Sequence, residues 1–315
     1  MIVNFLYCFD ENYNIQALTS INSLLNNASR KINLHILHKD PESFKSFEAL
    51  FENKEKIKNI TYYKYKKNNT KFPKLKGAHV SEATYYRMFI DDYIANDVEF
   101  LVYLDADIVC LNNPIEEIEN TVYKMQKENK PLGAMVEGTR SNSKELFEKL
   151  NLKNDNHFNA GVIIIDYKKW KQDNTAEKLL KIMEERFEKI IYWDQDILNI
   201  YYDDNFTKMK KSLNYGYSAT ETDSKLNNEV KNNVSLLHYS GKSKPWNVEN
   251  IIYPGSDIYQ NEFRKVGTEK YHIVFRKNFK TFIRYFKLLF SLKFLNLENP
   301  GSYLKISLIK MFRYK

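Results

Sequence analysis

A chain of 315 residues, 43% hydrophobic and 28% charged, has the composition of a folded globular protein with one large or two ordinary domains. Its 9 glycines and 7 prolines exclude a collagen-like or linker-like protein, and no repeat of fixed period is present. The formal net charge of +8 would indicate nucleic-acid binding if it were spread over the chain, but residues 270–315 alone carry a net +10. The remaining 269 residues are therefore nearly neutral.

Hydrophobic periodicity predicts strands that alternate with helices. The strands are expected at 2–8, 32–38, 60–65, 98–104, 132–136, 160–165 and 234–239, and the helices at 14–27, 41–53, 82–95, 144–150, 173–190 and 194–202. This alternation predicts an α/β fold with a mostly parallel sheet covered by helices on both faces. Such sheets bind ligands beyond the carboxyl ends of their strands, so polar residues just after a strand are the first candidates for a site.

The first segment, MIVNFLYCFDENY, is interpreted as a strand and not as a leader, because it lacks a basic start and soon reaches Asp10 and Glu11. Cys8 and Cys110 lie in apolar runs without a second ligand at metal spacing, which favours buried thiols in a reducing cytosol. The sequence shows no apolar run of eighteen residues that would span a bilayer. We expect a cytoplasmic protein.

The third predicted helix places a charge among apolar residues. Arg87 shares the helical spacing of Ala83 and Ile90, so its guanidinium lies on the inward stripe. A buried guanidinium needs an anion. Asp91, one turn along the helix, is one candidate partner, and a ligand or an active-site carboxylate is the other.

Two carboxylates follow the fourth strand, in LVYLDADIVC at 101–110. Asp105 and Asp107 stand at positions i and i+2 of an extended chain, so they point to one side and repel unless a cation or a shared proton lies between them. Two hard oxygen ligands at a sheet edge suit Mg²⁺ or Mn²⁺. In the alternative, one Asp caps the next turn and the other is solvated.

The last strand closes with an imidazole, in HYSGKSKPW at 238–246. His238 next to the carboxylates shifts the metal preference towards Mn²⁺, Gly241 allows a close approach of the backbone to a ligand, and Lys244 can pair with phosphate. Taken singly, His238 would be a core histidine and the lysine would be solvated. The combination is what indicates a site.

Two further segments supply polar groups at element ends. Asn159 opens the sixth predicted strand, and Asp194, Gln195 and Asp196 open the last predicted helix. Acidic residues in a first turn are usually caps, which accounts for one Asp and leaves the Gln unexplained. Motifs of the G-x-G-x-x-G, G-x-x-x-x-G-K-[ST] and G-x-S-x-G types are missing from the sequence, so any bound phosphate must be neutralised by a metal and a lysine.

The basic C-terminal segment has an amphipathic pattern. Its apolar set is Phe279, Phe282, Ile283, Phe286 and Phe290, and its basic set is Arg276, Lys277, Lys280, Arg284 and Lys287. This pattern suits the surface of an anionic membrane, and Pro300-Gly301 is expected to interrupt the helix before a second segment of similar character. The alternative is that the aromatic residues pack on the body. Nucleic-acid binding ranks third, because no nucleic-acid module is recognisable.

These segments together resemble glycosyltransferase family 8, the retaining enzymes close to the bacterial lipopolysaccharide galactosyl- and glucosyltransferases. The resemblance runs to about residue 250 through DENY, TYYRMFIDDYI, LVYLDAD, FNAG, DQDILN and HYSGKSKPW, in this order. The basic aromatic tail is also similar to the membrane-attaching C-terminus of those enzymes. Ala106 is one departure, at a position where relatives vary.

The resemblance implies a GT-A fold with a Rossmann-like, mixed and mostly parallel sheet, divided into a catalytic domain at 1–268 and a membrane-association tail at 269–315. It also implies a set of roles. Asp105, Asp107 and His238 would bind Mn²⁺, or Mg²⁺ as the alternative. On the nucleotide, Asp10 and Asn12 would hold uridine, and Gly241 and Lys244 would contact phosphate. The donor sugar would be surrounded by Arg87, Asn159, Asp194 and Gln195, and His79 would lie on the acceptor side.

The expected function is transfer of a hexose, galactose or glucose, from a UDP-sugar to a lipid-linked or surface-glycan acceptor, with retention of the anomeric configuration. We expect the reaction to take place at the inner face of the membrane and to involve no nucleic acid. Because Gln195 is a poor nucleophile, either Asp194 attacks from the opposite face or, as we prefer, the acceptor enters on the face that UDP leaves. A non-catalytic docking module with the same fold and a UDP-sugar hydrolase are the alternative functions.

Overall fold

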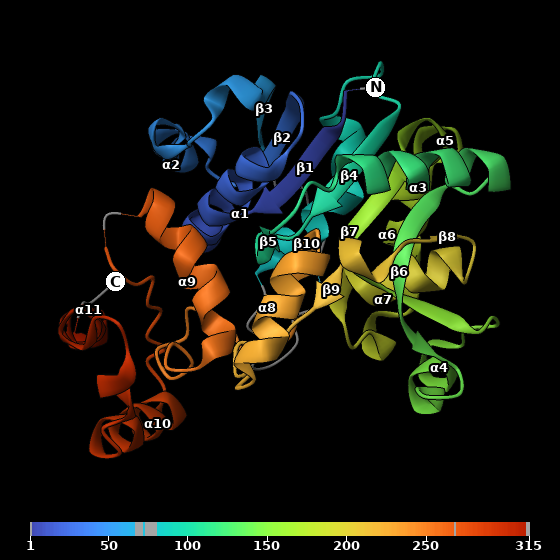
Figure 1. Cartoon of the computed structure of the whole chain (residues 1–315). Coiled ribbons are helices and arrows are strands. Elements are labelled where there is room, and N and C mark those ends of the chain that lie inside the picture. Colours follow the sequence, from blue (N-terminus) through green and yellow to red (C-terminus); the bar gives the residue numbers. More distant parts are fainter. Residues whose placement is uncertain (1, 67–71, 73–80, 268, 313–315) are drawn as a thin grey trace.

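The computed structural model describes residues 2–66, 72, 81–267 and 269–312 and contains two sheets (Figure 1). The large sheet consists, in spatial order, of β3 (Ile57–Lys64), β2 (Ile32–His38), β1 (Asn4–Phe9), β4 (Phe100–Leu104), β7 (Asn156–Asp166), β6 (Leu132–Thr139) and β8 (Thr207–Lys208). The small sheet consists of β5 (Ile108–Cys110), β10 (Leu236–His238) and β9 (Tyr215–Gly216). All seven predicted strands are present.

The large sheet is mixed and mostly parallel, as predicted. Only β7 runs antiparallel to its neighbours β4 and β6. The prediction was wrong for the last strand, because β10 pairs with β5 and β9 and does not join the large sheet. The sequence pattern also missed β5, β8 and β9, since strands of two or three residues are too short to show alternation.

Helices cover both faces of the large sheet, and the C-terminal helices lie beyond it. They are α1 (Asn14–Asn27), α2 (Pro41–Lys45), α3 (Ile115–Glu128), α4 (Lys144–Leu150), α5 (Tyr167–Gln172), α6 (Thr175–Glu185), α7 (Trp193–Tyr202), α8 (Ser224–Asn233), α9 (Pro254–Val266), α10 (Phe279–Phe290) and α11 (Pro300–Phe312), with a long 3₁₀-helix η4 (Glu82–Asp92). Periodicity missed α3, α5, α8 and α9, although the buried stripe of Ile118, Val122 and Met125 is a readable signal for α3.

Two predicted helices differ in type from the structure. The segment expected as an α-helix at 82–95 is the 3₁₀-helix η4, kinked at Phe89. Its β-branched and aromatic residues have low α-helix propensity, which agrees with the tighter form. The segment expected at 41–53 is the short α2 followed by a 3₁₀ turn, Ser46–Leu50.

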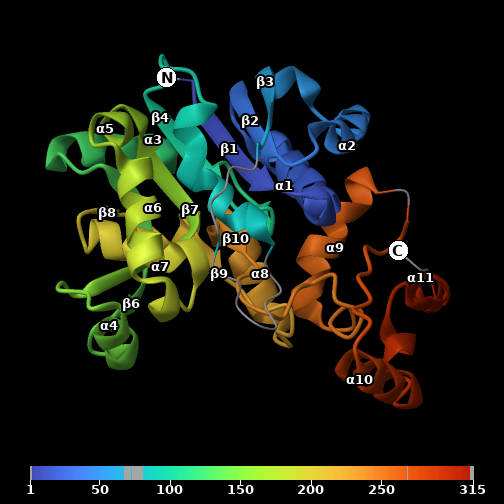
Figure 2. The ribbon, with the colours of Figure 1, turned by 180° about the vertical axis from the view of Figure 1, so that it is seen from behind.

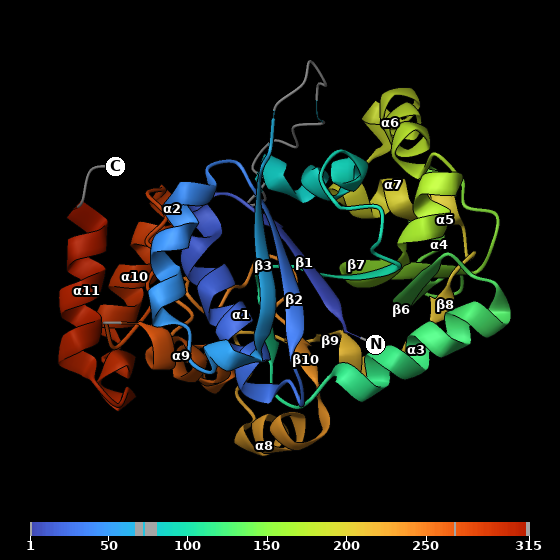
Figure 3. The same ribbon diagram turned by 90° about the horizontal axis from the view of Figure 1, so that it is seen from above.

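Successive residues of β1 enter two different cores. Phe5 and Tyr7 pack with α1 and α3 on one face, whereas Leu6 and Cys8 pack with η4, α6 and α7 on the other. Figure 3 shows α1 on one side of β1 to β3 and α6 and α7 on the other, and Figure 2 shows the second layer from behind. Cys8 and Cys110 are free and buried, as predicted.

The C-terminal helices form a smaller core at one end of the molecule (Figure 1). Tyr285 and Tyr303 of this core pack with Val248, and Val274 exchanges backbone hydrogen bonds with Trp246 and Val248. We expected Pro300 to interrupt a helix that continues from α10. In the structure α10 has already ended at Phe290, and Pro300 begins α11, because proline is tolerated in a first helical turn. In the part of the chain that the structure describes, no helix has the length and apolar character needed to cross a bilayer.

We expect His272→Gln to make the protein less sensitive to acid. His272 is buried with its Nδ1 2.6 Å from the hydroxyl of Tyr259, and burial lowers its pKa to about 3. The unfolded chain, with an imidazole pKa near 6.5, therefore binds the proton that the folded protein excludes, so stability falls as pH falls below about 6.5. Between pH 7 and about pH 5 the wild type should lose about 2 kcal/mol more than the variant.

Urea unfolding of both proteins at the two pH values measures this difference. At pH 7 and above, the imidazole is neutral in both states and the difference between the two proteins should not change with pH. Equal losses in the two proteins at about pH 5 would contradict the assignment of a neutral buried His272.

Candidate active site

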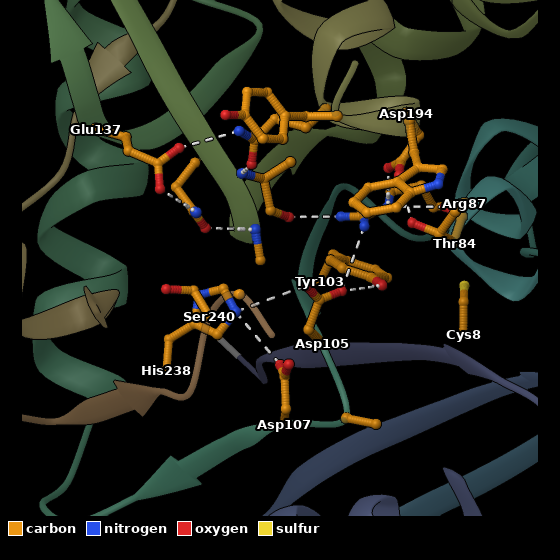
Figure 4. Close-up of a pocket in the computed structure, with 18 of the residues that line it drawn as sticks. Cys8, Thr84, Arg87, Tyr103, Asp105, Asp107, Glu137, Asp194, His238 and Ser240 are labelled. Carbon is orange, nitrogen blue, oxygen red and sulfur yellow. Dashed lines mark hydrogen bonds and ion pairs between the residues drawn. The ribbon is translucent and has the colours of Figure 1, made fainter. Parts of the chain in front are cut away.

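A cavity of about 480 Å³ lies beyond the carboxyl ends of β1 and β4. Its walls come from segments far apart in the sequence, including the ends of β1 and β4, residues of η4, β6 and β7, the start of α7 and the loop after β10. Figure 4 shows Glu137 and Cys8 on opposite sides of this cavity, with Asp105 and Arg87 between them. The strand-end rule therefore located the cavity correctly.

Three candidate metal ligands converge in the cavity. His238 Nε2 lies 3.3 Å from Asp107 Oδ1 and 3.9 Å from Asp105 Oδ2, and the ligand atoms of the three residues lie within 4.8 Å of one another. Asp107 Oδ1 is buried and accepts no hydrogen bond from the described residues. Two carboxylates and an imidazole with an unsatisfied oxygen are a donor set that fits a divalent cation such as Mn²⁺.

The small sheet is what brings His238 to the carboxylates. Asp107 immediately precedes β5, and the antiparallel pairing sets His238 of β10 opposite Ile108 of β5. The backbone N–H of Tyr239 also donates to the Asp107 carbonyl at 3.2 Å. The imidazole, 131 residues further along the chain than Asp107, therefore lies next to the second carboxylate.

The two oxygens of Asp105 have different partners. Oδ1 accepts from the Tyr103 hydroxyl at 2.6 Å and from Arg87 Nη2 at 3.3 Å, so Oδ2 faces the imidazole of His238. Burial raises the pKa of Asp105, and the Arg87 guanidinium opposes that rise. Tyr103 and Arg87 thus orient one candidate metal ligand.

Lys244 lies against the other candidate ligand. Its ammonium is 2.5 Å from Asp107 Oδ2 and 2.6 Å from the Tyr239 carbonyl, and the side chain is only 4% exposed. Burial acts to raise the pKa of Asp107, but Lys244 and His238 outweigh it and hold that pKa well below its usual range. Lys244 is therefore a fixed buried cation at the edge of the triad.

Arg87 pairs with active-site carboxylates and not with Asp91. Its Nε lies 2.7 Å from Asp194 Oδ2, its Nη1 donates to the Ala160 carbonyl at 2.5 Å, and its guanidinium stacks on the Tyr103 ring at 3.7 Å. The side chain is 2% exposed, so each of these contacts is shielded from water. The structure thus decides between the two partners that the sequence left open.

The start of α7 turns three successive side chains towards the cavity. Trp193, Asp194 and Gln195 all line it, which a regular helix does not allow, because successive residues project about 100° apart. Trp193 has a positive φ of 49°, a conformation that is rare for a residue with a bulky side chain. Asp196 stabilises this turn, since its Oδ2 accepts from the N–H groups of Ile191 and Tyr192 at 2.6 and 2.7 Å. The expectation that one of the two acidic residues caps the helix is wrong, because the start of α7 has no side-chain cap hydrogen bond and Asp196 stabilises the turn that precedes it.

Asp194 is buried and held on both oxygens. The Thr84 hydroxyl donates to its Oδ1, and Arg87 pairs with its Oδ2. Burial raises the pKa of Asp194 to about 6, while Arg87 acts in the opposite direction.

Glu137 connects the two amides of the site and was missed by the sequence analysis. Its Oε1 accepts from Asn159 Nδ2 at 2.9 Å and its Oε2 from Gln195 Nε2 at 3.0 Å, while Gln195 Oε1 accepts from the Ala160 N–H at 3.0 Å. It directly follows the strand predicted at 132–136, so the strand-end rule would have found it. In the structure it lies in an irregularity of β6, next to a register shift.

The remaining predicted residues lie as follows. Gly241, with φ of 78°, lines the cavity. Asp10 caps a 3₁₀ turn, Glu11–Tyr13, by accepting from the Asn12 N–H at 3.0 Å, and neither Asp10 nor Asn12 is among the residues that line the cavity, although their neighbours Phe9 and Tyr13 are. His79 lies outside the described residues.

We expect Arg87→Met to destabilise the protein by about 3 kcal/mol, because it leaves the buried Asp194 carboxylate without its cation. Adding Asp194→Asn to that variant should recover part of the loss, since the unpaired charge is then removed. Urea unfolding measures both. Arg30→Met is the matched control, because Arg30 pairs with Glu119 at the surface and should cost less than about 1 kcal/mol. Equal losses for Arg87→Met and Arg30→Met would contradict this account.

The chain is similar to several curated glycosyltransferases. It is 26% identical over 271 residues to the lipopolysaccharide 1,2-glucosyltransferase of Escherichia coli, covering 82% of this chain and 77% of that protein. It is 29% identical over 256 residues to the lipopolysaccharide 1,3-galactosyltransferase of Salmonella typhimurium, covering 77% and 72%. Glycosyltransferase GlyF of Streptococcus pneumoniae is 28% identical over 252 residues, or 77% of this chain, but the match spans only 56% of its length.

The fold is shared with solved structures of the same kind. Galactosyltransferase LgtC, crystallised with donor and acceptor sugar analogues, has a TM-score of 0.69 at 22% identity, covering 84% of this chain and 97% of that chain. This likeness shows that the fold is of the GT-A type, as expected. The model of glycosyl transferase family 8 matches residues 4–250, which include every described residue of the cavity. The chain therefore belongs to glycosyl transferase family 8.

Proposed function

We propose that this glycosyltransferase moves a hexose, galactose or glucose, from a UDP-sugar to a lipid-linked or surface-glycan acceptor, with retention of configuration and with Mn²⁺ or Mg²⁺ as cofactor. The observation that carries the proposal is the convergence of Asp105, Asp107 and His238 beside a buried Arg87–Asp194 pair in one cavity. The first group suits a metal-bound diphosphate and the second suits sugar hydroxyls. The names of the relatives, which act on lipopolysaccharide, support the acceptor class.

The charged residues divide into a phosphate side and a sugar side. Asp105, Asp107 and His238 would hold the cation, which would offset the negative charge that develops on UDP as it leaves. Lys244 and the backbone at Gly241 would bind the diphosphate beside it, and Asp10 and Asn12 would contact uridine at the adjoining edge.

Arg87, Asn159, Asp194 and Gln195 would surround the donor sugar. Both oxygens of Asp194 are occupied, by Thr84 and by Arg87, so the carboxylate is poorly placed to attack the anomeric carbon. This arrangement supports entry of the acceptor on the face from which UDP departs. Asp194 and Gln195 then orient the sugar and stabilise the positive charge at the anomeric carbon.

We expect the chain to release UDP in the presence of Mn²⁺ from UDP-galactose or UDP-glucose but not from UDP-N-acetylglucosamine, with faster release when a glycolipid acceptor is present. Asp107→Asn should lower kcat/KM by about 100-fold or more, because the substitution removes a charge that holds the cation. Asp155→Asn is the matched control, since Asp155 is exposed and pairs with Arg140 away from the cavity. No UDP release with any donor would overturn the proposal in favour of a docking module. UDP release without any glycosylated product would favour a hydrolase.

We also propose that residues 1–268 form the catalytic domain and that residues 269–315 attach it to the inner face of the membrane. Large apolar side chains are exposed along α10 at helical spacing: Phe279 (81%), Ile283 (39%), Phe286 (44%) and Phe290 (85%). Phe282 was expected on the same exposed stripe, but its ring packs on Phe275 with centroids 5.1 Å apart. Phe282 therefore does not belong to the exposed face. The exposed aromatic residues beside lysines and arginines support binding to anionic lipid.

We expect Phe279→Ser combined with Phe290→Ser to reduce sedimentation with anionic liposomes by about 10-fold, because each removes a large apolar side chain from the contact. UDP release from the soluble donor should be unchanged. Tyr123→Ser is the matched control, since Tyr123 is 69% exposed on α3, outside the C-terminal segment. Undiminished sedimentation of the double variant would remove the membrane proposal without affecting the transferase proposal.

A further inference from the structure

The ring of His238 is held in place by contacts outside the metal triad. A Cβ added at Gly161 would lie 2.2 Å from His238 Cε1, so the imidazole fills the space that a side chain at this position would take. His238 Nδ1, which adjoins Cε1 in the ring, lies 2.9 Å from Asn214 Oδ1. Gly161 thus fixes where the ring lies, and only the position of its proton remains to be set.

Asn214 is fully buried, and its orientation is determined by its neighbours. Its Nδ2 donates to Asn159 Oδ1 at 3.0 Å, and the same oxygen accepts from the Gly161 N–H at 2.9 Å. Asn159 Nδ2 donates to Glu137 at 2.9 Å. Because a backbone N–H only donates and a carboxylate only accepts, Asn159 has one favourable orientation, and it imposes one on Asn214.

The amide of Asn214 therefore presents its oxygen to the imidazole. An amide oxygen only accepts, so the proton of a neutral His238 must lie on Nδ1. The other nitrogen, Nε2, then turns a lone pair towards Asp107 Oδ1 at 3.3 Å. Two electron-rich atoms at that distance are stable when a cation lies beside both, and neutral imidazole with a free Nε2 is the form that binds metal ions.

We propose that Asn214 is a positioning residue that fixes the tautomer of His238 for metal binding, and that it links the metal ligands to the sugar-side residues Asn159 and Glu137. Asn214 makes these contacts through Asn159 and His238 and is not itself among the residues that line the cavity. The proposal rests on the proposed function only for the presence of a divalent cation. Partners of this kind typically contribute about 10- to 100-fold to metal affinity.

The competing account is that His238 carries both protons and forms a purely structural ion pair with Asp107. In that case Asn214 would accept a hydrogen bond without selecting a tautomer, and its removal would change stability but not metal affinity. The two accounts differ in whether Nε2 of His238 carries a proton and in how Mn²⁺ binding responds to substitution.

The tautomer can be read in the wild-type full chain without any bound ligand. We expect the ¹⁵N spectrum of the histidines at about pH 9 to show the Nδ1–H form for the signal that disappears in His238→Gln. A ring of His238 that carries a proton on Nε2, alone or together with Nδ1, would overturn the proposal. This measurement does not depend on transferase activity, so it stands even if the proposed function fails.

Mn²⁺ affinity tests the consequence. We expect Asn214→Leu to weaken Mn²⁺ binding by about 10- to 100-fold, measured without nucleotide from the electron paramagnetic resonance signal of free Mn²⁺. Asn214→Asp keeps an acceptor for Nδ1–H and should bind Mn²⁺ within a few-fold of the wild type. Unchanged affinity in a folded Asn214→Leu variant would overturn the proposal, and if that variant does not fold, the tautomer of the wild type decides.

Asn14→Leu is the matched control. Asn14 is also buried, and its Oδ1 lies 2.9 Å from Nε2 of another histidine, His38. Asn14→Leu should lower the free energy of unfolding about as much as Asn214→Leu does but leave Mn²⁺ affinity unchanged. An equal loss of Mn²⁺ affinity in Asn14→Leu would show that general destabilisation, and not the tautomer of His238, governs binding, and would overturn the proposal.

Discussion

The charge balance of the cavity is the constraint on which the rest of the site depends. Three buried or half-buried carboxylates, those of Asp105, Asp107 and Asp194, share two buried cations, Arg87 and Lys244. Arg87 forms a close ion pair with Asp194, at 2.7 Å, and a longer one with Asp105, at 3.3 Å. Lys244 pairs with one oxygen of Asp107. The negative charge that is left over is concentrated between Asp105 and Asp107, where His238 faces them, and an added cation would lower the electrostatic energy there.

The middle of β7 connects both halves of this arrangement through its backbone. The Ala160 carbonyl accepts from Arg87 and its N–H donates to Gln195, while the Gly161 carbonyl accepts from the N–H of Asp105. A strand that runs antiparallel to its neighbours can present these groups at the same edge as the parallel strands β1 and β4. Since the backbone of a central strand is among the most rigid parts of a fold, the sugar-side and metal-side residues are held at fixed separation.

Sequence patterns found some of the cavity residues that follow strands and failed where a position depends on tertiary geometry. Asp105, Asp107 and His238 were predicted together because each closes an apolar run. The partner of Arg87 was left open, because helical spacing points only to Asp91, whereas Asp194 lies 107 positions further along the chain. Asn214 carries no readable signal, since it lies between two elements of two or three residues and acquires its role only through contacts with other buried amides.

The candidate metal ligand set depends on the register of strands that are only three residues long. Pairing of β10 with β5 sets His238 opposite Ile108, and a slip of one residue would turn the imidazole to the other face of the small sheet. Strands this short have little intrinsic preference for one register. Two contacts that oppose such a slip are the packing of the imidazole on Gly161 and the hydrogen bond from His238 Nδ1 to Asn214 Oδ1, because a slipped strand would lose both. The same side-chain contacts that define the tautomer of the metal ligand therefore also stabilise the strand pairing that delivers it.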